Sequence, residues 1–255
     1  MPSDSATVST IDDVVAQLDR IIDAECAHKS PLAYFPILYR KVTLRVKEGI
    51  ENNEFDNNAR MEALDVVFAN RYLDAYRCLG EHQPVTESWQ KAFDAAKNGK
   101  LLIMQHLLLG INAHINLDLG IAVSDLVGEG GVLSPLQNDY NKINAILASM
   151  VSEVETRITA VSPLFGLLEK YGKGREDLLV SFSIDVAREG AWLFANQYHA
   201  SGDRADCLKK RDTVIALLAD KLTTCKSWVL KALVSTIFFF ETKDVPSVVH
   251  ALGQE

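Results

Sequence analysis

The residues best suited to chemistry lie in one apolar segment, residues 101–127, and they recur at helical spacing. His106, His114 and Asp118 stand eight and four residues apart. Gly110 lies midway between the two histidines. On a helix of 3.6 residues per turn these positions form a row that drifts slowly around one side. Imidazole nitrogens and carboxylates bind transition metals and also transfer protons. We therefore expect His106, His114 and Asp118 to ligate a transition metal ion (Fe or Zn) or to act as catalytic groups.

The spacing of the two histidines leaves the chemistry open. Eight residues correspond to roughly 12 Å of helical rise, whereas a familiar zinc-binding helix places its histidines four residues apart. A single ion bound by His106 and His114 would require rings that lean together and further ligands from other helices. A separate ion at each histidine and a buried polar network that only fixes packing are the alternatives. Gly110, which has no side chain, allows another group to approach between them.

A second polar stripe runs along another face of the same helix and consists of amides. Gln105, Asn112 and Asn116 fall together there. Polar groups on a mostly apolar helix are unfavourable unless each finds a partner. We expect Asn112 and Asn116 to orient a substrate, with internal hydrogen bonding as the alternative.

Facing helices must supply the rest of any site, so polar residues within apolar stretches are the next candidates. Asp65 is the best acid, because its neighbours within Leu64–Phe68 are apolar, and we assign it a catalytic or ligand-orienting role. Tyr72 falls on the same side of that helix. Arg188 and Trp192 share a patch on another helix. We expect Tyr72, Arg188 and Trp192 to contact the substrate.

Two arginines, Arg71 and Arg188, have apolar sequence neighbours. A buried guanidinium needs an anion, and a structural ion pair with a carboxylate meets that need. An anionic substrate bound bidentately is the alternative. Asp139 and Asn144, early in the helix that follows Ser134-Pro135, are further candidates for the site.

Helix signals dominate the chain, and no alternating strand pattern accompanies them. Ser-Pro occurs at three apparent helix starts, where serine caps the helix and proline loses no hydrogen bond. Thr10 with Asp13 resembles a capping box. We expect one all-α domain of nine or ten helices around the apolar helix at about 100–127. Short tails are expected at about 1–9 and 243–255. The predicted helices are at about 11–27, 31–52, 57–79, 86–98, 100–127, 135–160, 163–171, 175–200, 203–223 and 226–241.

Composition excludes several classes of protein. Hydrophobic residues make up 48% of the chain and charged residues 24%, which excludes a disordered or collagen-like chain. The net charge of -8 argues against nucleic-acid binding, which depends on clustered Lys and Arg. The four cysteines lie far apart without a CxxC pair, as in a cytoplasmic protein with reduced thiols.

Neither a targeting segment nor a membrane span is expected. The N-terminus carries acids where a secretory signal carries basic residues and an apolar core. Residues 101–127 contain polar side chains that a lipid-facing helix would have to desolvate, and residues 228–240 are shorter than the roughly 20 needed. The chain also lacks a P-loop, a GxGxxG motif after a strand and a GxSxG elbow, so the usual ATPase, dinucleotide-dependent and α/β-hydrolase motifs are missing.

Three blocks of sequence carry a family resemblance: Tyr34–Tyr39, Leu64–Tyr72 and, above all, His106–Asp118 with its GINAHIN core. The chain resembles a microbial family catalogued only as a domain of unknown function, from about Tyr34 to the segment Ala187–Trp192. The resemblance implies a recurring helical domain with its polar motif in the same place. It implies no activity.

The residues favour a metal-dependent enzyme, an oxidoreductase or a hydrolase, that acts on a small, partly apolar molecule beside the central helix. A metal-free enzyme or binder of small molecules that uses the same polar motif is one alternative. A structural or interaction module, whose motif only sets helix register, is another. The sequence leaves the substrate and the oligomeric state open.

Overall fold

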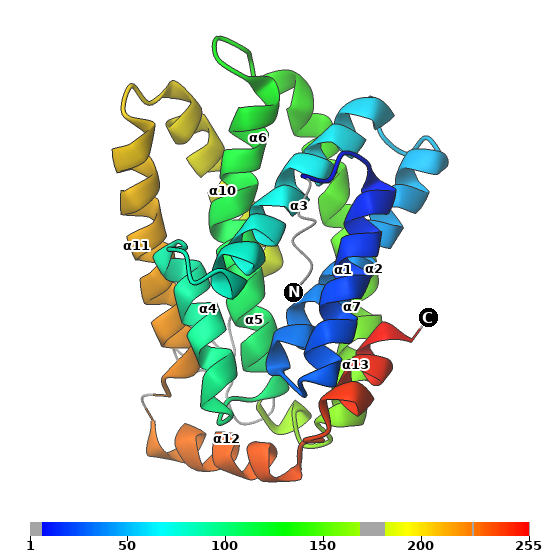
Figure 1. Cartoon of the computed structure of the whole chain (residues 1–255), viewed down its shortest axis with the longest axis vertical. Helices are drawn as coiled ribbons and strands as arrows, with labels where there is room; N and C mark the ends of the chain where they lie inside the picture. The colour runs from blue at the N-terminus through cyan, green and yellow to red at the C-terminus, as the bar shows by residue number, and fades with distance from the viewer. Residues whose placement is uncertain (1–6, 169–181, 226, 255) are drawn as a thin grey trace.

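The computed structural model describes residues 7–168, 182–225 and 227–254, and every regular element within them is helical (Figure 1). The predicted all-α, single-domain fold is confirmed. The short elements are the 3₁₀ turns Pro31–Ala33 and Ser134–Leu136 and a π-turn at His114–Asp118. The longer helices are α1 (Ile11–Ala27), α2 (Tyr34–Glu51), α3 (Asn58–Gly80), α4 (Glu87–Asn98), α5 (Ile103–Ala113), α6 (Leu119–Val127), α7 (Gln137–Val161), α10 (Ile184–Ala200), α11 (Arg204–Thr223), α12 (Trp228–Phe240) and α13 (Val245–Gly253).

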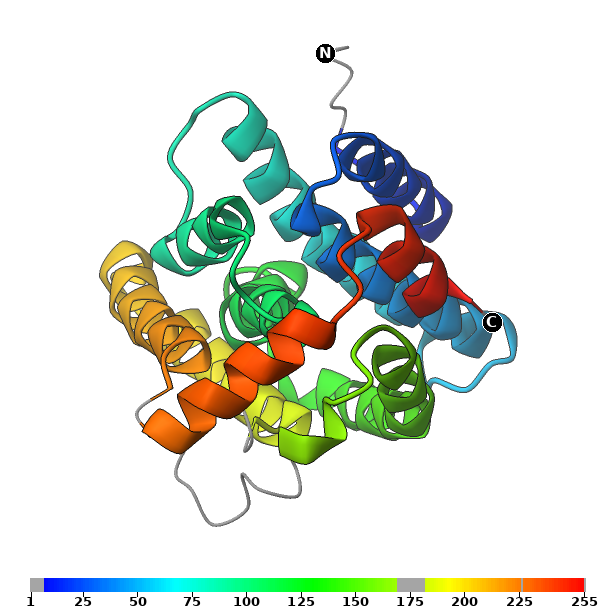
Figure 2. The same ribbon diagram turned by 90° about the horizontal axis from the view of Figure 1, so that it is seen from below.

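One continuous helix, Ile103–Val127, forms the centre of the molecule and consists of α5, the π-turn and α6. Figure 2 shows this green helix ringed by the others. Because its residues are apolar on nearly all sides, packing against neighbours on every face is favourable. Within the described residues it is the one unbroken helix long and apolar enough to cross a membrane, but 89% of its most apolar window is buried inside the protein.

The π-turn interrupts the central helix at the polar motif. The amide of Leu119 donates to the carbonyl of His114, five residues earlier, so the turn holds one residue more than an α-turn. Single π-turns inside α-helices frequently occur at functional sites. The sequence-based prediction of a regular helix did not include this turn.

Some helix starts agree with the capping signals, but of the three serines that precede a proline only Ser30 acts as a cap, because Ser134 lies inside its 3₁₀ turn and Ser162 follows the end of α7 and donates to Glu241. Thr10 and Asp13 form the predicted capping box of α1, and Ser30 caps the turn that leads into α2.

The predicted C-terminal tail, 243–255, is wrong, because α13 occupies most of it and buries Val248 against α2 and α7. Parts of the helices predicted at 163–171 and 175–200 fall on residues 169–181, outside the described residues.

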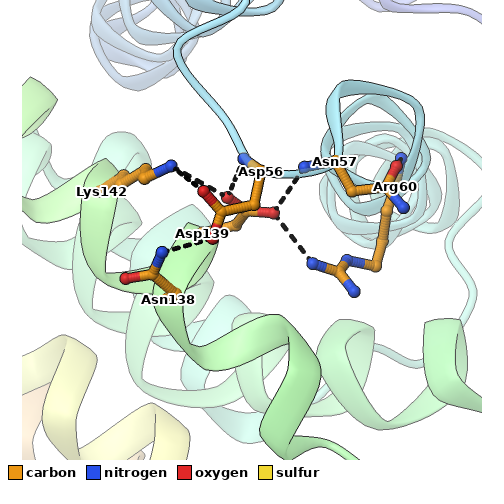
Figure 3. Close-up of polar contacts among 6 residues, drawn as sticks. All are labelled: Asp56, Asn57, Arg60, Asn138, Asp139 and Lys142. Carbon is orange, nitrogen blue, oxygen red and sulfur yellow. Dashed lines mark hydrogen bonds and ion pairs between the residues drawn. The ribbon is translucent and has the colours of Figure 1, made fainter.

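Asp139 joins α7 to the start of α3 (Figure 3). Its fully buried carboxylate accepts hydrogen bonds from the amides of Asp56 (2.6 Å) and Asn57 (3.1 Å) and from Arg60 (2.9 Å). Lys142 lies 3.6 Å from the same carboxylate. A negative charge beside the amides that precede a helix satisfies free donors and opposes the helix dipole. Asp139, a candidate from sequence, is therefore a structural clamp.

Two other buried acids play the same part elsewhere. Asp212 of α11 accepts the amides of Glu87 (2.6 Å) and Ser88 (3.0 Å) at the start of α4. Glu241, just after α12, accepts the amide of Ile103 (3.2 Å) at the start of the central helix. These contacts fix the start of α4 and the start of the central helix, which carries the polar motif.

Candidate functional site

His114 and Asp118 form a buried pair at the π-turn. Nδ1 of His114 lies 3.3 Å from Oδ2 of Asp118. A carboxylate can only accept, so Nδ1 carries the hydrogen and Nε2 of the neutral ring keeps its lone pair. The structure brings His114 and Asp118 together, and Asp118 is the hydrogen-bond partner of the histidine rather than a second metal ligand.

Asp118 is itself held by two further side chains. The indole Nε1 of Trp89 donates to Oδ2 at 2.8 Å, and Nε of Arg71 lies 3.5 Å from Oδ1 as an ion pair. The sequence-based prediction of a structural ion pair is correct for Arg71. Because Asp118 already serves Trp89, Arg71 and His114, its predicted role as a metal ligand is not supported.

Aromatic rings enclose the imidazole of His114. Phe68 stacks on it with ring centroids 3.6 Å apart and an angle of 9°, and Tyr39 meets it edge-on at 4.6 Å. Burial lowers the pKa of His114 below its usual range, against the opposing effect of Asp118. The ring is therefore neutral near pH 7. Nε2 has no hydrogen-bond partner among the described residues, an arrangement that costs about 1–3 kcal/mol.

His114 lines a cavity of about 610 Å³ that lies between α2, α3, the central helix, α7 and α10. A volume of this size is typical of sites for small organic molecules. Most of its wall is apolar, from side chains such as Leu108, Ile111 and Ile143. The polar and charged residues of the wall are Tyr39, Asp65, His114, Tyr140, Glu155, Ser183, Asp185 and Arg188.

Asp65 and Tyr39 belong to the same part of the wall as His114. Burial raises the pKa of Asp65 to about 7, helped by the charge of Glu62. Burial, followed by the charge of Asp65, raises the pKa of Tyr39 well above its usual value. Oδ2 of Asp65 and Oη of Tyr39 each make no hydrogen bond within the described part of the chain. Asp65, selected from its apolar sequence neighbours, thus lines the same cavity as His114.

Arg188 also lines the cavity, from α10. Its Nε donates to Oδ1 of Asn144, and its Nη2 donates to the carbonyl of Tyr140 at 2.7 Å. The guanidinium lies over the Tyr140 ring, 4.3 Å from the centroid. No carboxylate of the described residues lies within ion-pair distance of Arg188, so the structural ion pair expected from sequence is absent there.

His106 lies away from this site. It faces a recess of about 20 Å³ that Phe35 and Tyr72 also line, and burial lowers its pKa to about 4. The ring of Phe35 covers Gly110, between the two histidines. The predicted metal set of His106, His114 and Asp118 is therefore not assembled. Within the described ranges, no group of three or more His, Cys, Asp or Glu side chains is arranged to hold a metal ion.

The amide stripe binds another helix instead of a substrate. Nδ2 of Asn116 donates to Oδ1 of Asn112 (3.0 Å), and Nδ2 of Asn112 donates to the carbonyl of Ile215 on α11 (3.0 Å). Arg211 donates to the carbonyl of Asn116 (3.0 Å). The predicted substrate-binding role of these two asparagines is wrong, because the Asn112 amide donates to α11, the Asn116 amide donates to Asn112, and neither residue lines the cavity.

Two other predicted substrate contacts pack into the core. Tyr72 meets Phe35 edge-on at 5.1 Å and lines the small recess beside His106. Trp192 packs on Tyr140 at 4.8 Å, behind the cavity wall. Neither side chain lines the large cavity.

Sequence reasoning missed Tyr39, Trp89 and Tyr140. Tyr39 lies in the Tyr34–Tyr39 block, yet nothing there shows that α2 faces His114. Trp89 stands in a short amphipathic helix, where core packing is the ordinary role of tryptophan. The contribution of these three residues to the site depends on which helices pack together, and the sequence alone does not show that.

Comparison with known proteins places this architecture in a family. No curated protein and no solved structure matches the chain. Residues 11–225 match a family described as a family of unknown function, DUF5995. The match contains α1 to α11, the polar motif and the described cavity wall, and it extends beyond the span of the resemblance seen in the sequence. The chain therefore belongs to DUF5995, a family of unknown function.

Proposed function

We propose that the protein binds a small, largely apolar molecule in the 610 Å³ cavity and transfers a proton to or from it through His114, without a metal ion. One observation carries this proposal. His114 lines the cavity, its Nδ1 lies 3.3 Å from Oδ2 of Asp118, and its buried Nε2 has no hydrogen-bond partner among the described residues.

The surroundings of His114 suit a general base. A neutral imidazole is required at the start, and burial favours it by lowering the pKa. When Nε2 takes a proton, Asp118 stabilises the imidazolium through Nδ1–H, as the acid of a catalytic triad does. Trp89 and Arg71 keep that carboxylate in place, so the pair needs little reorganisation during proton transfer.

Asp65 supplies a second titratable group. With a pKa raised to about 7, its carboxyl is present in both protonation states near neutral pH. A site with one neutral histidine and one partly protonated acid can take a proton at one group and give one at the other. Tyr39 lies beside both, since its ring contacts His114 and its pKa responds to Asp65.

The Kemp elimination of 5-nitrobenzisoxazole tests for such a base. A base removes the carbon-bound proton, the N–O bond breaks, and the electron pair leaves on the phenolate oxygen of a coloured product. We expect saturable turnover by the wild-type protein, loss of at least tenfold in His114→Gln, and an intermediate loss in Asp118→Asn.

The matched control is His106→Gln, because His106 is also buried on the central helix but faces the small recess. Its rate should stay near that of the wild type. Ile143→Trp, which fills the cavity from α7, should abolish saturation. A rate that His114→Gln leaves unchanged contradicts the proposal.

A further inference from the structure

The charge of Arg188 indicates what kind of molecule the cavity takes. We propose that the ligand is an apolar monocarboxylate, whose carboxylate pairs with Arg188 and whose hydrocarbon part lies along the apolar wall. This inference rests on the proposed function for the cavity itself, and it adds the class of ligand.

The first support is the uncompensated charge. Arg188 is only 4% exposed, and its described hydrogen-bond and ring partners, Asn144 and Tyr140, are neutral. The exposed carboxylate of Asp185, one turn earlier on α10, acts on Arg188 through its charge but forms no ion pair with it. Two buried carboxylates of this protein have arginine partners, Asp139 with Arg60 and Asp118 with Arg71. A buried cation that forms no ion pair is unfavourable, so its presence in a cavity wall favours an anionic ligand.

The second support is the way the guanidinium is held. Nη2 of Arg188 donates to the carbonyl of Tyr140, and Oη of Tyr140 donates back to the carbonyl of Arg188, both at 2.7 Å. This reciprocal pair joins α7 to α10 and fixes the side chain before a ligand arrives. A planar guanidinium held in this way matches the two oxygens of a carboxylate.

The rest of the wall selects among anions. Glu155 and Asp185 are the exposed acids of the lining, and both repel a doubly charged ligand such as a phosphate monoester. Arg188 is the one cation among the described lining residues. The remaining surface is mainly aliphatic and aromatic and suits a hydrocarbon body. A single negative charge on an apolar molecule fits these features together.

Isothermal titration with four chain-matched probes tests the inference: dodecanoate, dodecanol, methyl dodecanoate and dodecyl phosphate. The wild-type protein should bind dodecanoate at least tenfold more tightly than dodecanol or the ester. In Arg188→Gln this preference should collapse to less than threefold. Arg188→Lys, which keeps the charge but loses the planar fork, should fall between them.

Arg211→Gln is the matched control, because Arg211 is a partly buried arginine that does not line the cavity. It should keep the wild-type preference. Equal binding of dodecanoate and dodecanol by the wild type, tighter binding of dodecyl phosphate, or binding of none of the four probes overturns the inference. If Arg188→Gln fails to fold, the ratio of the wild-type affinities for dodecanoate and dodecanol still decides the test.

The two proposals can fail separately. Equal binding of acid and alcohol together with elimination that depends on His114 rejects the carboxylate site and leaves the acid–base proposal. A preference for dodecanoate that depends on Arg188, together with an elimination rate that His114→Gln leaves unchanged, supports the carboxylate site and rejects His114 as the base.

Discussion

Phe35 fills the space that Gly110 leaves open on the central helix. A Cβ atom at residue 110 would lie 2.5 Å from Cγ of Phe35, much closer than real contacts allow. The same ring meets His114 edge-on at 5.6 Å and lines the recess that His106 faces. Phe35 therefore separates the two histidines and gives each a different environment, one beside the large cavity and one away from it.

This contact predicts that Gly110→Ala destabilises the protein. Alanine favours a helix by about 1 kcal/mol over glycine, but the clash with the buried ring outweighs that gain. We expect a net loss of roughly 1–2 kcal/mol in urea unfolding. Gly80→Ala is the matched control, since an added Cβ there meets nothing within 4 Å. It should be neutral or stabilising, and equal effects at both positions would contradict the role of Phe35.

Asp65 predicts an unusual dependence of stability on pH. Its pKa rises from 3.8 in the unfolded chain to about 7 in the folded protein, so between these values the folded protein binds more protons. The contribution of Asp65 to the free energy of unfolding is therefore most favourable below pH 4 and is lost as the pH rises through 7.

Asp65→Asn removes this dependence. The variant should gain stability relative to the wild type between pH 5 and pH 8, by on the order of 2–3 kcal/mol. Urea unfolding of both proteins at the two pH values measures the gain. If the free energies of unfolding of variant and wild type differ by the same amount at pH 5 and pH 8, burial does not shift the pKa of the Asp65 carboxyl.

Asp118→Asn tests the support of His114. The substitution leaves Arg71 without its buried counter-ion and changes the partner of the imidazole, so we expect a loss of about 3–5 kcal/mol in urea unfolding. Trp89→Phe removes one hydrogen bond to the same carboxylate and keeps most of the ring packing. Trp89→Phe should therefore be less destabilising than Asp118→Asn, with a loss of about 1–2 kcal/mol in the free energy of unfolding. A loss below 1 kcal/mol in Asp118→Asn would mean that the pair is not a stable unit.

The polar clamp of Figure 3 predicts a contrast between two neighbouring acids. Asp139→Ala leaves the amides of Asp56 and Asn57 without their acceptor, and we expect a loss of about 2–4 kcal/mol. Asp56→Asn changes an exposed pair with Lys142, so its urea midpoint should stay close to that of the wild type. Similar midpoints for the two variants would contradict the clamp.

Some of this could be predicted from sequence, because it depends on local patterns. The apolar stretch 101–127 predicted a buried central helix, and the apolar neighbours of Asp65 predicted a buried acid. The helix within 243–255 was missed although the sequence signals it, since Asp244 precedes Pro246 and apolar residues at helical spacing. Asp244 does cap α13, by accepting the amide of Ser247.

Other features depend on contacts between helices. Periodicity placed Asn112 and Asn116 on one face, but only the packing of α11 shows what that face meets. The π-turn is a change of register that no single residue type signals. The choice of neutral partners for Arg188 depends on how α7 meets α10, which the sequence of neither helix specifies.

The most direct test of the central claim is the ¹⁵N NMR spectrum of the imidazole of His114 in protein labelled at histidine, assigned by the signal that His114→Gln lacks. We expect a neutral ring at pH 7 with hydrogen on Nδ1 and none on Nε2, and a shifted Nε2 resonance when a ligand enters the cavity. A charged ring, or hydrogen on Nε2 at pH 7, would contradict the assignment of His114 as the base.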